Sequence, residues 1–171
     1  MIPALITSLL WAISAACGQR AAKSLGSLRA NRLRLLFASV VLGLITVIFY
    51  RDSFSAPTLF WLVISGIVGF GIGDVALYIA LARIGTRLTV LITFCFAPVF
   101  SALGEWLWFG TILPWQQTLA ALGILGGVCL TLKPSSPDSE RYGHVGFGIA
   151  MAFIAAFGQG FGAVFTHKAN L

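Results

Sequence analysis

The chain has 171 residues, of which 58% are hydrophobic and only 9% are charged. Soluble globular domains carry about 25% charged residues, so this chain has too few polar side chains to cover a water-soluble particle. Its net charge of +6 comes from basic residues in short clusters between apolar runs, which argues against a nucleic-acid-binding surface. The composition therefore indicates an integral membrane protein in contact with the lipid bilayer.

Several long runs contain no Asp, Glu, Lys or Arg. A helix needs about 20 residues to cross the hydrocarbon core, and a helix satisfies its own backbone hydrogen bonds there. The pattern predicts an all-α, polytopic transmembrane bundle of about six helices. A turn near 110–114, which contains Gly110 and Pro114, separates the fourth helix from the fifth. In chain order we expect helices over residues 2–22, 33–50, 58–82, 88–109, 114–133 and 144–166.

The basic residues predict an orientation. Nine of the eleven Lys and Arg residues fall in the first, third and fifth connections, and only Arg51 and Lys168 fall on the other side. Cytoplasmic loops are enriched in Lys and Arg, so we expect a multi-pass inner-membrane protein with its N-terminus outside. The first positive charges follow the first apolar run instead of preceding it, which favours a retained helix over a signal peptide.

An internal repeat is the main sign of domain organisation. Residues 11–19 align without gaps on residues 151–159, with five of nine positions identical. An odd number of helices precedes the second copy, so the two copies would face opposite ways, as in secondary transporters. We expect a five-helix membrane repeat over 1–133, a polar linker over 134–143, and the first helix of a second, truncated repeat over 144–171. The chain is then a fragment, or a homodimer partner supplies the second half.

The segment Tyr78–Phe100, YIALARIGTRLTVLITFCFAPVF, resembles the junction of the third and fourth helices in EamA domains of the drug/metabolite transporter superfamily. The resemblance continues through Leu107–Gly110 and the glycine-rich stretch Leu122–Val128. It implies a secondary transporter, an exporter of small metabolites or drugs, that works by alternating access between inverted repeats. The chain departs from the family at Thr111, where members carry Glu, and in having six predicted helices where members have ten.

Asp74 is the leading candidate for a functional residue, because an ionisable group in hydrocarbon is costly. It lies nine residues before Arg83, about 13 Å along a helix and so close to the membrane midplane. Tyr78, one turn later, could form a hydrogen bond with it. Either Asp74 couples a proton or cation or contacts a substrate, or it holds helices together as a hydrogen-bonded acid.

Other polar positions extend this hypothesis. Gln19 and Gln159 occupy matching places in the repeat, so they could line a central cavity or bond helices together. Pro98 kinks the fourth helix and is either a hinge or a static bend. Glu105, between two Trp residues, is expected at the wetted interface. Gly-x-x-x-Gly pairs predict tight helix packing, and they are Gly69 with Gly73, Gly123 with Gly127, and Gly158 with Gly162.

Other chemistry finds no support in the sequence. The three cysteines are widely spaced within apolar runs and suggest neither a metal site nor a disulfide framework. No catalytic set, cofactor motif or Walker motif is recognisable, so we expect neither an enzyme nor an ATP-driven pump. The alternative to a transporter is a membrane scaffold or assembly subunit, in which Asp74 and the glycines only pack helices. An intramembrane enzyme is a weaker third reading.

Overall fold

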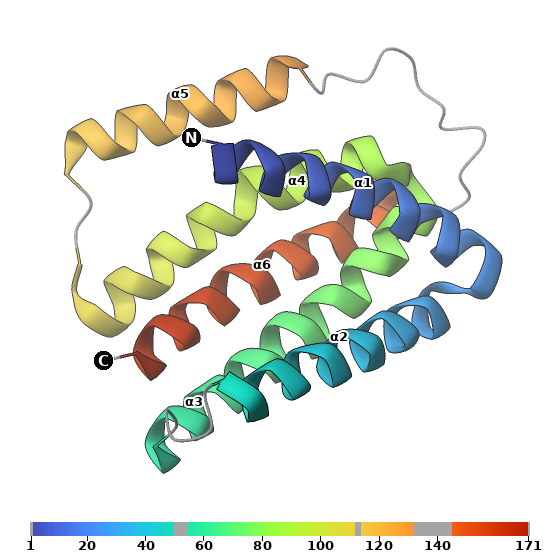
Figure 1. Cartoon of the computed structure of the whole chain (residues 1–171). Helices are drawn as coiled ribbons and strands as arrows, with labels where there is room; N and C mark the ends of the chain where they lie inside the picture. Colours follow the sequence, from blue (N-terminus) through green and yellow to red (C-terminus); the bar gives the residue numbers. More distant parts are fainter. Residues whose placement is uncertain (1, 50–54, 112–113, 132–144, 171) are drawn as a thin grey trace.

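The computed structural model describes residues 2–49, 55–111, 114–131 and 145–170. These residues form helices and no strands, which confirms the predicted all-α bundle. Three segments are long and apolar enough to cross a membrane, namely Ser27–Phe49, Ala56–Phe109 and Val145–Ala169. The elements are α1 (Ile2–Leu25), α2 (Ser27–Phe49), α3 (Ala56–Gly66), η1 (Ile67–Asp74), α4 (Val75–Phe109), α5 (Trp115–Thr131) and α6 (Val145–Ala169) (Figure 1).

The first connection is much shorter than predicted. α1 continues to Leu25 and α2 begins at Ser27, so the turn is centred on Gly26, with φ of 83°. Glycine adopts this left-handed conformation without steric cost. The expected ends at residues 22 and 33 are wrong because Arg, Lys and Leu are good helix formers and extend both helices beyond the apolar run. Arg34 therefore lies about two turns inside α2 instead of at its start.

The third span changes its helical geometry halfway along. α3 starts at the N-cap residue Ser55, whose hydroxyl accepts a hydrogen bond from the backbone N–H of Thr58. From Ile67 to Asp74 the chain forms a π-helix, η1, which carries Gly69, Gly71 and Gly73. π-helical segments are rare and occur frequently at functional sites.

The connection between the third and fourth spans is a break at one residue. α4 runs from Val75 to Phe109, but Gly85 inside it has φ of 75° and ψ of 171°. α4 therefore consists of two arms, 75–84 and 86–109, as the basic pair Arg83 and Arg87 predicts. The second arm ends at Gly110, which is left-handed with φ of 65°. This end agrees with the predicted boundary.

α6 lies between the two arms of this hairpin and forms the centre of the bundle (Figure 1). It packs antiparallel to the third span through glycines. A Cβ on Gly158 would lie 2.7 Å from the Cα of Gly73, and one on Gly162 would lie 3.1 Å from the Cα of Gly69. The missing side chains therefore allow the two backbones to touch, which is the arrangement typical of Gly-x-x-x-Gly pairs.

The other face of α6 packs against the second arm of α4 through aromatic rings. Phe153 contacts Phe96 with ring centroids 4.5 Å apart, and Phe157 contacts Phe100 at 5.5 Å. The pairs advance together along the chain, so these two helices run parallel. Gly160 fits beside the backbone between them, where a Cβ would lie 2.7 Å from the carbonyl oxygen of Ala97.

α5 lies at the outside of the bundle and follows the second arm of α4 (Figure 1). A Cβ at Gly123 or Gly127 meets no atom within 4 Å in the part of the chain that the structure describes. Among the described residues, these two glycines therefore make no close helix contact, unlike Gly69, Gly73, Gly158 and Gly162 at the centre of the bundle. The predicted linker over 134–143 falls outside the described residues.

Candidate functional site

A cavity of about 650 Å³ lies between the helices at the level of η1. This volume is within the range of small-molecule sites, roughly 300–1,000 Å³. Its walls come from every described helix except α5. The lining residues are Thr7, Leu10, Trp11, Ser14, Ala15, Arg34, Ser65, Gly69, Phe70, Asp74, Leu77, Tyr78, Leu81, Val90, Gln159, Gly162, Ala163 and Thr166.

The charged centre of this cavity is an ion pair. Nη2 of Arg34, on α2, donates a hydrogen bond to Oδ2 of Asp74, the last residue of η1. The Asp74 side chain is 7% exposed, and the Arg34 side chain is 38% exposed. The guanidinium also lies over the ring of Tyr78, with its carbon 5.4 Å from the ring centroid. The buried carboxylate is thus neutralised by a cation that can still reach the open space.

The local sequence explains this placement. Asp74 and Tyr78 lie one helical turn apart and share a face of the third span. Gly18 of α1 lies against that face, where a Cβ would be 3.3 Å from the hydroxyl oxygen of Tyr78. The turn at Gly26 then brings α2 back along α1, so that its third turn presents Arg34 to Asp74. Two glycine positions therefore allow the pair to form.

The sequence indicates Asp74 and Tyr78 as site residues but does not single out Arg34. Arg34 counts among the basic residues of the first connection, because four others precede it between positions 20 and 32. A signal was nevertheless present. Arg34 is the last of these cations, lies within the predicted helix 33–50 and directly precedes a charge-free run.

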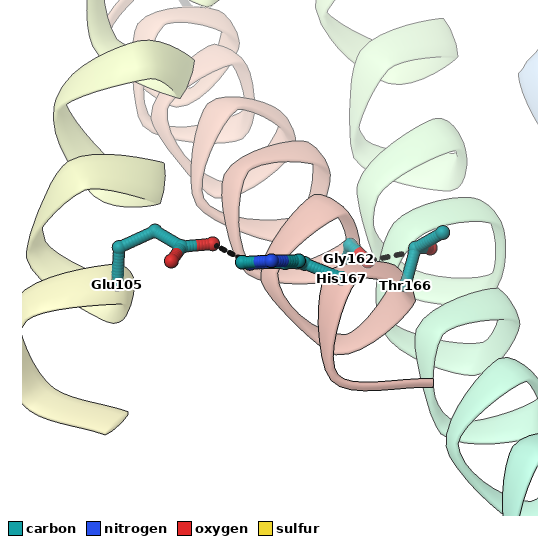
Figure 2. Close-up of polar contacts among 4 residues, drawn as sticks. All are labelled: Glu105, Gly162, Thr166 and His167. Carbon is teal, nitrogen blue, oxygen red and sulfur yellow. Dashed lines mark hydrogen bonds and ion pairs between the residues drawn. The ribbon is translucent and has the colours of Figure 1, made fainter. Parts of the chain in front are cut away.

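Polar groups of α6 complete the wall opposite Arg34. Gln159 lines the cavity, as the internal repeat suggested. Two hydroxyls, Ser65 on α3 and Thr166 on α6, lie further along the contact of these helices. The Ser65 hydroxyl donates to the carbonyl oxygen of Gly162 at 2.7 Å and lies 2.8 Å from Oγ1 of Thr166. Thr166 also donates to the Gly162 carbonyl, at 3.1 Å (Figure 2). The cavity therefore combines one ion pair with uncharged hydrogen-bonding groups and apolar walls.

Two other candidates lie away from the cavity. Oε1 of Gln19 accepts a hydrogen bond from the Thr86 hydroxyl, which joins α1 to the break at Gly85. Pro98 is exposed on the second arm of α4, and neither residue lines the cavity. The structure thus brings together Asp74, Tyr78 and Gln159 but not Gln19 and Pro98.

A second charged contact joins the ends of α4 and α6. Nδ1 of His167 lies 2.8 Å from Oε1 of Glu105 (Figure 2). The His167 side chain is half exposed, so the pair stabilises this end by at most about 1 kcal/mol. Figure 2 shows that Glu105 and Thr166 lie on different sides of α6, so this contact is separate from the hydroxyl cluster of the cavity.

Comparisons with known proteins support the assignment suggested by the sequence. The profile of the EamA-like transporter family matches residues 1–133, which include α1 to α5 and most of the cavity wall. Neither the search of curated proteins nor the search of solved structures gives a match. The profile match covers more than half of the chain and includes the span that carries Asp74 and Tyr78. The chain belongs to the EamA-like transporter family.

Proposed function

We propose that this chain is a secondary transporter that exports small metabolites or drugs by alternating access, with the central cavity as its substrate site. Members of its family are membrane transporters of the drug/metabolite superfamily and not enzymes. The observation that carries the proposal is the Arg34–Asp74 ion pair inside the cavity. Burying two charges costs several kcal/mol per ion before their attraction offsets it, so an ion pair facing a cavity favours a functional role over simple packing.

The internal repeat supports the expected domain organisation. Gly18 in α1 and Gly158 in α6 occupy matching positions, and both are places of close approach, against Tyr78 and against Gly73. We propose that residues 1–133 form one repeat and that 144–171 open the second, after the linker 134–143. Alternating access would then exchange two inverted halves around the cavity.

The transport test compares carboxylates inside and outside the cavity. In proteoliposomes with an imposed proton gradient, we expect wild-type protein to move at least one of three probes: ethidium, benzoate or a neutral phenyl glycoside. Asp74→Asn should reduce that flux about tenfold or more, because it removes the carboxylate that pairs with Arg34. The matched control Glu105→Gln, outside the cavity, should retain flux. If no probe moves, the scaffold replaces the transporter as the proposed function. If Asp74→Asn transports as well as wild type, the chain is a transporter but Asp74 does not couple transport.

The orientation has its own test. Counted from the sequence, nine basic residues against two predict that the odd-numbered connections lie in the cytoplasm. A reporter enzyme that is active only in the periplasm, fused after Ser136, should therefore be silent. The same reporter fused after Gly110 should be active, because that turn lies at the opposite end of α5. Activity after Ser136 together with silence after Gly110 would reverse the orientation.

A further inference from the structure

Asp74 accepts a hydrogen bond from only one of the nitrogens of the Arg34 guanidinium. The ion pair involves one nitrogen, Nη2, and one carboxylate oxygen, Oδ2. Nε of the same side chain is buried and has no hydrogen-bond partner in the part of the chain that the structure describes. A guanidinium typically holds a carboxylate through two parallel N–H donors, which is a stronger and more directional contact than a single bond. The edge formed by Nε and Nη2 is therefore an incompletely filled carboxylate site.

The Arg34 side chain lines the cavity and has suitable walls around it. Arg34, Asp74 and Tyr78 all line the cavity, together with Trp11 and Phe70. The Arg34 side chain is more than one-third exposed, so it can turn toward a ligand, whereas Asp74 is held at the end of η1. Aromatic rings and aliphatic side chains make up most of the remaining wall. The cavity thus offers one anion-binding edge beside an apolar space.

We propose that the cavity binds a small organic monoanion, an apolar or aromatic carboxylate, which takes the Nε–Nη2 edge of Arg34 in exchange for Asp74. This inference rests on the proposed function, because it assigns a substrate class to the same cavity. One guanidinium neutralises one carboxylate, and an isolated buried carboxylate is costly. Asp74 therefore takes up one proton from solvent as the anion binds. The cavity is neutral before binding, with Arg34 and Asp74 both charged, and neutral afterwards, with Arg34, the anion and the protonated acid.

Among the titratable groups that line the cavity, Asp74 is the carboxylate that can accept this proton. Of the titratable and charged side chains on the described elements, only Arg34, Asp74 and Tyr78 line the cavity. Those elsewhere on the packed helices are Cys17, Arg20 and Lys23 on α1, Arg29 and Arg32 on α2, Arg83, Arg87, Cys95 and Glu105 on α4, and His167 and Lys168 on α6. His167 pairs with Glu105, and the ammonium of Lys168 lies 5.3 Å from the ring centroid of Phe109.

The experiment measures benzoate binding to the purified full chain by titration calorimetry, with benzamide and benzyltrimethylammonium as neutral and cationic controls. We expect benzoate to bind and the two controls to bind about tenfold more weakly or not at all. Repeating the titration in phosphate and in Tris at one pH should show uptake of about one proton per benzoate. Asp74→Asn should bind benzoate more tightly, because the competing carboxylate is gone, and without proton uptake.

The double variant Arg34→Gln/Asp74→Asn controls for folding. It leaves no unpaired charge, so it should fold, and it should lose benzoate binding about tenfold or more because the guanidinium is absent. Weaker benzoate binding in Asp74→Asn, or retained binding in the double variant, would overturn the proposal. If benzyltrimethylammonium or benzamide binds wild type and benzoate does not, the substrate class is wrong but the cavity remains the proposed site. If none of the three binds, this proposal fails, and the flux of ethidium and of the phenyl glycoside decides separately whether the proposed function holds.

Discussion

Replacing Arg34 with Gln should lower the free energy of unfolding by about 3–5 kcal/mol, whereas Asp74→Asn should lower it by about 1–2 kcal/mol. The two substitutions break the same ion pair, but they leave different charges behind. Arg34→Gln leaves a carboxylate that is 7% exposed, with no cation beside it. Asp74→Asn leaves a guanidinium that is 38% exposed and can turn toward water in the cavity. The order of the two effects follows from this difference in burial.

Unfolding in a mixed detergent followed by circular dichroism at a fixed pH checks this order. The double variant Arg34→Gln/Asp74→Asn is the control, and it should recover most of the loss because both charges are gone. Non-additivity of this kind is the expected behaviour of residues in direct contact. Equal losses for the two single variants, or an additive double variant, would show that the ion pair is not the buried contact described above.

Gly158→Leu should abolish the folded state of the bundle. A Cβ at this position would lie 2.7 Å from the Cα and 2.9 Å from the N of Gly73, and 2.8 Å from the carbonyl oxygen of Val68. All three atoms belong to backbone, so no side chain can turn away to make room. Overpacking in a well-packed interior typically costs 1–3 kcal/mol, and a branched side chain against backbone exceeds that range. α6 must then separate from η1, and the cavity wall that Gln159 and Gly162 supply is lost with it.

The matched control is Gly146→Leu, on the same helix. A Cβ at Gly146 meets no atom within 4 Å among the described residues, so this substitution should leave thermal stability within about 1 kcal/mol of wild type. Size-exclusion chromatography in detergent and the melting temperature distinguish the two variants. A folded, monodisperse Gly158→Leu protein would contradict the close approach of α6 to the third span.

The helical architecture is the part that the sequence predicts best. Apolar runs determine the spans because every backbone polar group within lipid needs an internal partner. The break at Gly85 and the end at Gly110 follow from glycine between helical segments, where a left-handed residue is needed. The boundary at Gly26 was harder to predict. Basic residues are compatible both with a cytoplasmic loop and with the ends of long helices, and composition does not distinguish them.

The site was only half predictable for a related reason. Asp74 stands alone in an apolar run, so its cost in hydrocarbon marks it. Its partner comes from 40 residues earlier in the chain, and no local spacing connects Arg34 with Asp74. Likewise, each Gly-x-x-x-Gly pair could be recognised, but not that the pair at 69 and 73 packs against the pair at 158 and 162. Such pairings depend on how the helices pack in the tertiary structure. The spacing of residues within a single sequence does not show which distant segments come into contact.

The glycine contact between η1 and α6 also has a mechanical consequence. Backbones in direct contact have no side chains between them that could change rotamer, so these two helices resist sliding and behave as one rigid body. The parallel aromatic rows join the second arm of α4 to the same body. α1 and α2 are linked to each other by a turn at a single glycine, and both line the cavity. The hairpin of α1 and α2 contacts this body through side chains, at Tyr78 and at Asp74, so a relative movement of the two parts would take place at these contacts and not between η1 and α6.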